Sequence, residues 1–333
     1  MQKKWVSLLL CLSLTATGIA QSVAPEPTVA NAVLKKVSQI KSEFVALKLP
    51  AAQQESLIPL LSRSERAAQL GHIYLSLHVL QFAMSLYAGY AFTQSQSASG
   101  KVQLPTFEQE WRRLGPEIAA RQRRLSSAQK LPLAVQAVIE RALTQVQPNY
   151  QASLLYGREA GVENGLFYLG SAEGQLDFVA FCHALKFPAP DVSPLPLPTK
   201  ELAATEADVL AAYRLLDTPE QHNTFIRVNS ALKMAQDLAQ EHRQSGVWLQ
   251  VLEARRALAA IVIATSENHT ATDLRKQSET IRTQLSKSKS DQSIGWLYWQ
   301  MAEAALVTDD LKSAQAILHQ VLPRYFQTQT RNK

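Results

Sequence analysis

Residues 33–47, VLKKVSQIKSEFVAL, decide the fold class of this 333-residue chain. Their apolar positions follow one another at intervals of four, three, four and three, which is the spacing of one face of an α-helix. These positions are Val33, Val37, Ile40, Phe44 and Leu47. The pattern stops before Pro50, where we expect the helix to end because a proline disfavours helical backbone in the residue before it.

The same periodicity continues through most of the chain, and alternating apolar and polar residues never run for more than a few positions. The chain holds only 12 glycines, fewer than the turns of an all-β fold need. We therefore expect an all-α protein of stacked helical hairpins. The pattern predicts helices over residues 108–127 (interrupted near Gly115-Pro116), 131–147, 175–187, 201–216, 219–243, 247–266, 271–287, 293–307 and 309–325, with a polar loop at 94–100.

The first twenty residues have the composition of a secretory signal peptide. Lys3 and Lys4 precede an apolar run over residues 6–20, which ends in Gly18-Ile19-Ala20. This run is shorter than the roughly 20 residues that a membrane-spanning helix needs. We therefore expect residues 1–20 to be cleaved, with an N-terminal membrane anchor as the alternative.

Cleavage would change the cysteine count and the charge. It would leave Cys182 as the one cysteine, and the loss of two lysines would lower the formal net charge from +6 to +4. An exported chain of this size without a disulfide is typical of the bacterial periplasm, with secretion from the cell as the alternative. Export and the mild charge both argue against a nucleic-acid partner.

A proline-rich segment divides the remaining chain. Residues 187–199, FPAPDVSPLPLPT, contain five of the 15 prolines, a composition that favours extended polyproline II backbone. The alternative is an ordered loop that packs its apolar residues across one lobe. We interpret the chain as a flexible leader (21–30), an N-terminal helical lobe (31–187), a linker (188–199), a C-terminal helical-repeat lobe (200–327) and a tail (328–333).

Two segments, residues 67–90 and 294–322, pair small residues twelve positions apart. Two antiparallel helices approach closely only where side chains are small, so each pair is expected to mark a helix crossing. The pairs are Gly71 with Ala83 and Ala302 with Ala314. Residues 294–322 have a turn signal at 308–310, whereas residues 67–90 have His78-Val79 in the corresponding place, so one continuous helix is the alternative there.

The first segment also contains Leu70-Gly71 and Tyr74, and the second contains Tyr298, Met301 and Leu318. With these residues, both segments resemble the tetratricopeptide repeat, a helix–turn–helix unit of 34 residues. Both segments lack the closing proline of the repeat. The resemblance implies stacked hairpins with a concave face that binds a protein or peptide.

Five glycines lie within residues 157–174, and the first three, Gly157, Gly161 and Gly165, are predicted on one face of a helix. A glycine inside a helix costs about 0.5–1 kcal/mol relative to alanine, so a compensating role is expected. Close helix packing is one such role. The alternatives are a groove floor that leaves room for a ligand or peptide, and a broken, irregular segment.

The sequence contains no motif for metal binding or nucleophilic catalysis. None of the seven histidines has another at i+3 or i+4, and Cys182 lies in an apolar helix. We therefore predict no catalytic residue, metal or cofactor. The enzyme alternative is a peptidoglycan-cleaving protein of the lytic transglycosylase type, in which Glu159 or Glu163 would act as general acid. The Glu-Ser pair of that family is missing.

Two surface features could contact a partner. One is the basic cluster, which is either a solvated face or a site for an anionic envelope lipid or acidic partner. It consists of Arg112, Arg113, Arg121, Arg123, Arg124 and Lys130. The other is the pair Trp296 and Trp299, which is predicted as core, with a binding edge as the alternative. Overall the sequence indicates an exported, non-enzymatic helical-repeat scaffold of the periplasm that holds a protein or peptide.

Overall fold

The computed structural model describes residues 27–47, 49–98, 100, 102–127, 130–187, 198–214, 216, 218–262, 269–288 and 291–330. Within these ranges the chain forms helices that pack in pairs and no strand, as predicted. The predicted signal peptide, most of the leader and nearly all of the proline-rich linker lie outside the described residues. The last four residues of the predicted leader are the start of the first helix, which begins at Pro27.

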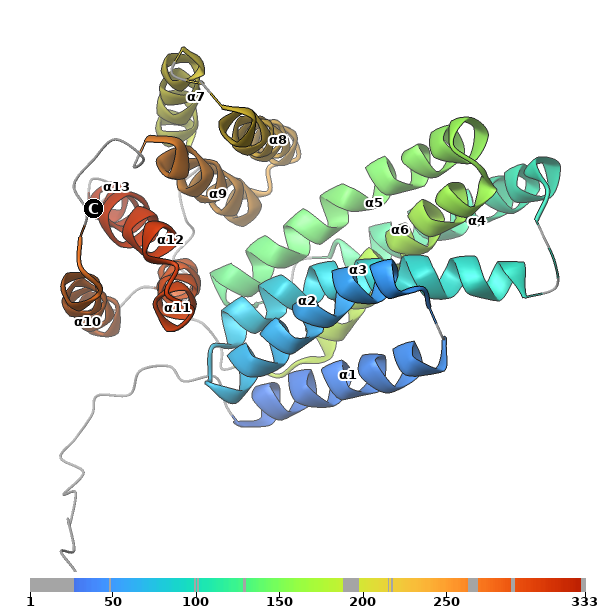
Figure 1. The fold of residues 1–333 in the computed structure, drawn as a ribbon, viewed down its shortest axis with the longest axis horizontal. Helices are drawn as coiled ribbons and strands as arrows, with labels where there is room; N and C mark the ends of the chain where they lie inside the picture. The colour runs from blue at the N-terminus through green and yellow to red at the C-terminus, as the bar shows by residue number, and fades with distance from the viewer. Residues whose placement is uncertain are drawn as a thin grey trace, which may run out of the picture.

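Six helices precede the linker and lie alongside one another in Figure 1. They are α1 (Pro27–Ala46), α2 (Ala51–Gln69), α3 (Ile73–Ser97), α4 (Leu104–Leu125), α5 (Leu133–Glu159) and α6 (Val162–Ala184). The predicted stripe of α1 is confirmed, because Val33, Val37, Ile40 and Phe44 are all buried. The helix ends at Ala46, ahead of Pro50.

The helices after the linker gather at one end of this group (Figure 1). They are α7 (Thr199–Tyr213), α8 (Pro219–Gln240), α9 (Gln244–Val262), α10 (Ala271–Lys287), α11 (Ser293–Val307), α12 (Leu311–Gln315), a π-helix (Ala316–Val321) and α13 (Leu322–Thr330). The bounds of α10 and α11 match the predicted ranges. The predicted tail begins too early, because α13 continues to Thr330.

Prolines interrupt the helices less than predicted. Helix α4 runs through Pro116, and α5 runs through Pro148, so the predicted interruption and the predicted end at residue 147 are both wrong. An internal proline removes one backbone hydrogen bond and costs about 3 kcal/mol. Burial of Leu114 and Ile118 on either side of Pro116 offsets that cost. Helix α3 likewise extends to Ser97, into the predicted polar loop.

The two segments that resemble tetratricopeptide repeats differ in structure. Residues 294–322 form two helical stretches separated at 308–310, and Ala302 and Ala314 are fully buried where α11 and α12 pack together. In residues 67–90, by contrast, α3 is continuous. Gly71 is not at a helix crossing but in the α2–α3 turn, with a φ of +74° and nothing within 4 Å of an added Cβ. Ala83 is fully buried within α3.

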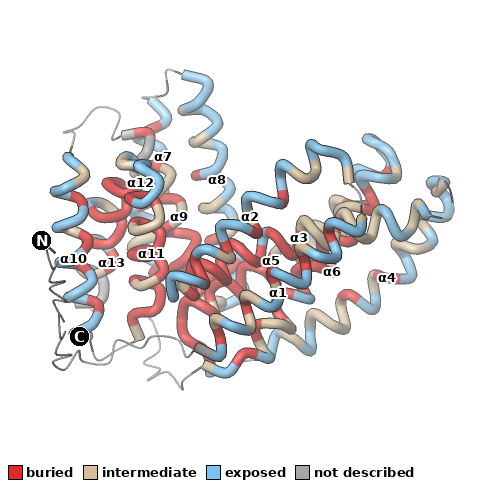
Figure 2. Tube along the Cα trace, turned by 60° about the horizontal axis from the view of Figure 1, so that its bottom comes forward, coloured by how far each residue is buried: buried red, intermediate tan, exposed pale blue. Residues whose placement is uncertain are grey.

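The main apolar core takes residues from both sides of the linker, and buried residues extend along the molecule in Figure 2, while α7 and α8 pack with α9 in smaller separate clusters. Phe107 and Phe178 from the first group are fully buried in it, and so are Trp248, Tyr298 and Tyr325 from the second. The lobes predicted at 31–187 and 200–327 therefore pack against each other through α5 with α9 and α3 with α11.

Hydrogen bonds between these two groups cap helix N-termini. The first N–H groups of a helix have no partner within it. The amide of Leu75 in α3 donates to Gln300 Oε1 at 3.0 Å, and the amide of Leu133 in α5 donates to Asp291 Oδ2 at 2.8 Å. In the opposite direction, the amide of Gly246 in α9 donates to Glu140 Oε2 at 2.6 Å. Each group of helices thus supplies hydrogen-bond acceptors to helix N-termini of the other group.

Candidate functional site

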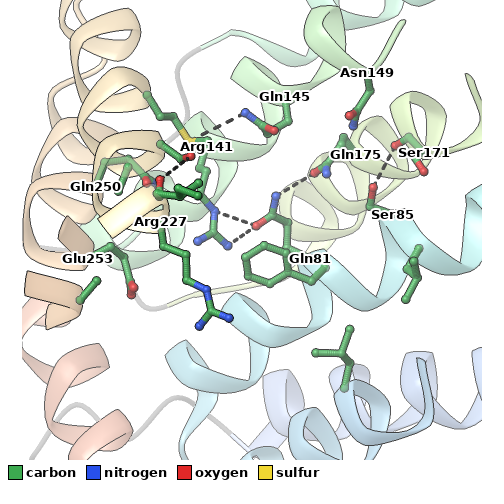
Figure 3. Close-up of a pocket in the computed structure, with 18 of the residues that line it drawn as sticks. Gln81, Ser85, Arg141, Gln145, Asn149, Ser171, Gln175, Arg227, Gln250 and Glu253 are labelled. Carbon is green, nitrogen blue, oxygen red and sulfur yellow. Dashed lines mark hydrogen bonds between the residues drawn. The ribbon is translucent and has the colours of Figure 1, made fainter. Parts of the chain in front are cut away.

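A pocket of about 850 Å³ lies between the two groups of helices. Its lining comes mainly from α3, α5 and α6 on one side and from α8 and α9 on the other (Figure 3). The volume falls within the range of about 300–1,000 Å³ that is typical of ligand sites. The shape of this pocket therefore depends on how the two groups of helices pack together, which the shared core and the capping hydrogen bonds maintain.

Apolar side chains form part of the wall. Phe82 of α3 is 45% exposed and Ile226 of α8 is 61% exposed, although both are large apolar residues. Leu60, Leu86, Phe167 and Met234 extend the same wall. Such a group of exposed apolar side chains around a concave surface is typical of a binding site.

A chain of buried polar side chains crosses the floor of the pocket, as Figure 3 shows. Arg141 of α5 donates from Nε to Gln81 Oε1 at 2.9 Å, and its Nη2 donates to the same oxygen. Gln81 Nε2 in turn donates to Gln175 Oε1 of α6 at 2.8 Å. The guanidinium of Arg141 also lies over the ring of Phe82, 4.4 Å from its centroid.

Arg141 carries a buried charge that no described carboxylate contacts within ion-pair distance, although the negative charge of Glu253 raises the pKa of Arg141. Arg141 is only 5% exposed, and its guanidinium makes no ion pair with any of the residues that the structure describes. Burial lowers the pKa of Arg141 to about 10, so the guanidinium is still protonated at neutral pH. Buried charges are normally paired, because the loss of hydration is costly.

Two further arginines border the pocket. Arg256 of α9 donates from Nη2 to Glu253 at 2.9 Å, and this neighbouring carboxylate raises the pKa of Arg256. Arg227 of α8 is exposed and has no partner among the described residues. The pocket lining therefore has three guanidinium groups against the single carboxylate of Glu253.

Side-chain amides supply additional hydrogen-bonding groups. Gln250 of α9 is 3% exposed, and its Nε2 has no hydrogen-bond acceptor within the described part of the chain. Gln145 of α5 reaches only the sulfur of Met234, at 3.9 Å. Amides both donate and accept, so these groups can bind either polar atom of a peptide bond.

The predicted glycine face is not part of one helix. Gly157 lies in the last turn of α5, Gly161 lies in the turn with a φ of +102°, and Gly165 belongs to the first turn of α6. A Cβ on Gly165 would come within 2.8 Å of the Cα of Gly157 and within 2.6 Å of the Phe107 ring. These contacts are those of close helix packing, and none of the three glycines lines the pocket.

The later glycines of the same segment orient the pocket wall. A Cβ on Gly170 or Gly174 would meet the backbone of α3 at Ala88 or Met84, within 2.8 Å. Helix α6 therefore presses this face against α3. Its neighbouring residues Phe167, Tyr168, Ser171 and Gln175 line the pocket.

Acidic residues pair with three of the six members of the basic cluster. Arg113 pairs with Glu110 at 2.6 Å, and Arg121 pairs with Glu173 at 2.7 Å and with Asp177. Arg112 lies 3.5 Å from Glu108. Arg123, Arg124 and Lys130 are exposed and form no ion pair with described residues. The cluster is thus half a set of helix–surface ion pairs and half a set of solvent-exposed cations.

The remaining predicted residues lie outside the pocket. Trp299 is buried and donates its indole N–H to the carbonyl of Ser278 at 3.1 Å, with Trp296 at the edge of its ring. Glu159 and Glu163 are exposed at the ends of α5 and α6. The thiol of Cys182 is fully buried, and burial raises its pKa.

No family model, curated protein or solved structure matches this chain. Among the described residues, no group of three or more histidine, cysteine, aspartate or glutamate side chains could hold a metal ion. Within the same residues, none of the helices has both the length and the apolar character needed to cross a membrane.

Proposed function

We propose that this protein is an exported, non-enzymatic binding protein. It holds a segment of a protein or peptide partner in the pocket that has α3, α5 and α6 on one side and α8 and α9 on the other. Export is supported by the composition of residues 1–20. Binding is supported by the pocket, where exposed apolar side chains lie beside amides with unused hydrogen-bonding groups.

This combination fits a peptide because a peptide presents the same two kinds of group. Its backbone carries one N–H and one C=O per residue, which the amides of Gln145 and Gln250 can bind. Its apolar side chains can pack against Phe82, Phe167 and Ile226. The single observation that carries the proposal is the buried Nε2 of Gln250, a donor without a protein acceptor beside this wall.

An array of random octapeptides, probed with the purified protein, tests this function. We expect a subset of peptides to bind, and Ile226→Ser to weaken their binding at least tenfold because it removes an exposed apolar wall residue. Leu210→Ser on α7 is the matched control, since Leu210 is also exposed but does not line the pocket. An absence of bound peptides, or equal weakening by both variants, would contradict the proposal.

A further inference from the structure

We infer that the pocket selects acidic peptides, and that Arg141 and Arg227 bind the carboxylates of the ligand while Arg141 determines the selectivity. This inference rests on the proposed peptide-binding function and deepens it. The charges of the pocket supply the first argument. The one carboxylate of its lining, Glu253, is held by Arg256 at 2.9 Å. Neither Arg141 nor Arg227 forms an ion pair with a described residue, and Arg141 has only the more distant charge of Glu253.

The environment of Arg141 supplies the second argument. Its Nε and Nη2 are occupied by the neutral oxygen of Gln81, whereas Nη1 makes no hydrogen bond to a described residue. A carboxylate that enters the pocket could accept from Nη1. It would give this buried cation a direct ion pair, and hydrogen bonds between two charged groups are the strong ones. The gain is largest where water is excluded, which is the case at the 5% exposed Arg141.

The buried amide of Gln250 supplies the third argument. Gln250 lines the same pocket, and its buried Nε2 lacks an acceptor among the described residues. A carboxylate has about four lone-pair sites and donates nothing, so it can satisfy this donor together with a guanidinium. Arg227, which is exposed on the opposite helix α8, can bind a second acidic side chain near the opening. The site therefore fits a peptide with carboxylates beside apolar residues.

Paired synthetic peptides test this inference by isothermal titration calorimetry. The probes are octapeptides taken from the bound set, N-acetylated and C-amidated, each prepared with two Glu residues and again with Gln in both places. We expect the Glu peptides to bind the protein at least tenfold more tightly than the Gln peptides. Added salt should reduce this preference but not abolish it, because the carboxylate at Arg141 is screened from solvent.

Variants separate the two arginines. Arg141→Gln is expected to remove the preference for Glu peptides, and Arg227→Gln to reduce it about threefold to tenfold. Arg123→Gln on α4 is the matched control for an exposed arginine and should leave it unchanged. If Arg141→Gln fails to fold, Arg227→Gln decides the test, because Arg227 makes no contact that the fold needs.

The outcomes distinguish the two proposals. Equal affinity of the wild-type protein for Glu and Gln peptides would overturn the acidic selectivity and leave the peptide-binding function standing. A preference that both Arg227→Gln and Arg141→Gln leave intact would overturn the role of these arginines. If neither peptide of any pair bound, the proposed function itself would fail and the inference with it.

Discussion

The guanidinium of Arg141 lies over the ring of Phe82, 4.4 Å from its centroid, on the floor of a pocket where no carboxylate of the described chain reaches it. A cation over an aromatic face is stabilised by the ring quadrupole. The ring therefore provides part of the compensation that a counter-ion would otherwise provide.

Replacing this ring tests its contribution to stability. We expect Phe82→Leu to lower the free energy of unfolding by about 0.5–2 kcal/mol, the range for cation–π contacts from exposed to desolvated. Ile58→Leu on α2 is the control, because Ile58 has the same 45% exposure as Phe82 but no aromatic ring that could bind a cation. Urea denaturation of both variants measures the difference. Equal stability of the two variants would show that the ring contributes only apolar surface.

Asp291 caps one helix from each of the two groups of helices. Its Oδ2 accepts from the amide of Leu133 in α5, and its Oδ1 accepts from the amide of Ser293 in α11, both at 2.8 Å. Loss of a helix cap costs about 0.5–2 kcal/mol, so Asp291→Ala is expected to lower the unfolding free energy by about 1–3 kcal/mol. Asp291→Asn keeps one acceptor oxygen and should lose about half as much. Thermal or urea unfolding in which the alanine variant matches the wild type would contradict this role.

Gly165 leaves no room for a side chain. An alanine there would place its Cβ 2.8 Å from both the Cα of Gly157 and the carbonyl oxygen of Ser153. In an open helix this change stabilises by about 0.5–1 kcal/mol, but here we expect a loss of about 1–3 kcal/mol because the α5–α6 contact must open. Glu163→Ala, an exposed change on the same turn, should stay within about 0.5 kcal/mol of wild type. Calorimetry that finds Gly165→Ala stabilising would disprove the close-packing role.

His78 makes stability depend on pH. Burial lowers the pKa of His78 well below its usual range, and the positive charges of Arg141 and Arg256 lower it further. The folded protein therefore keeps this imidazole neutral, whereas the unfolded chain protonates it near pH 6.5. The unfolded state binds more protons below that pH, so the unfolding free energy falls as the pH falls from 7 to 5.

The slope that His78 contributes is about 1.4 kcal/mol per pH unit below its unfolded pKa. Burial also lowers the pKa of His72, His183 and His319, so a smaller decline should remain in the His78→Gln variant. Urea denaturation at pH 7 and pH 5 compares the two proteins. Identical declines in both would show that His78 takes up its proton without cost in the folded state.

Much of the fold could be predicted from the sequence because the signals are local. The stripe of α1 needs only its own residues, and α10 is preceded by the N-cap Thr270, whose side chain accepts from the amide of Asp273 in a capping box. The errors arose where tertiary burial outweighs a local rule, as at Pro116 inside α4. The spacing of Gly157, Gly161 and Gly165 suggested one helix, although Gly161 is the turn between two.

The pocket could not be predicted in the same way, because its residues come together only in the folded chain. Gln81, Arg141, Gln175 and Gln250 lie on four helices far apart in sequence, and no periodicity relates them. One signal was present: Arg141 stands within the apolar run AVIERALTQV at residues 137–146. A cation that a helix buries needs a compensating partner, so this position indicates a candidate binding site.

Site-specific photo-crosslinking tests most directly whether the pocket holds the partner segment. A photo-reactive phenylalanine analogue at position 82 replaces one ring with another inside the pocket, and the same analogue at position 45 lies on the exposed end of α1, outside the pocket. After irradiation with a Glu-containing octapeptide, mass spectrometry should find the peptide joined to position 82 and not to position 45. A peptide that binds but is joined at position 45, or at neither position, would contradict the account.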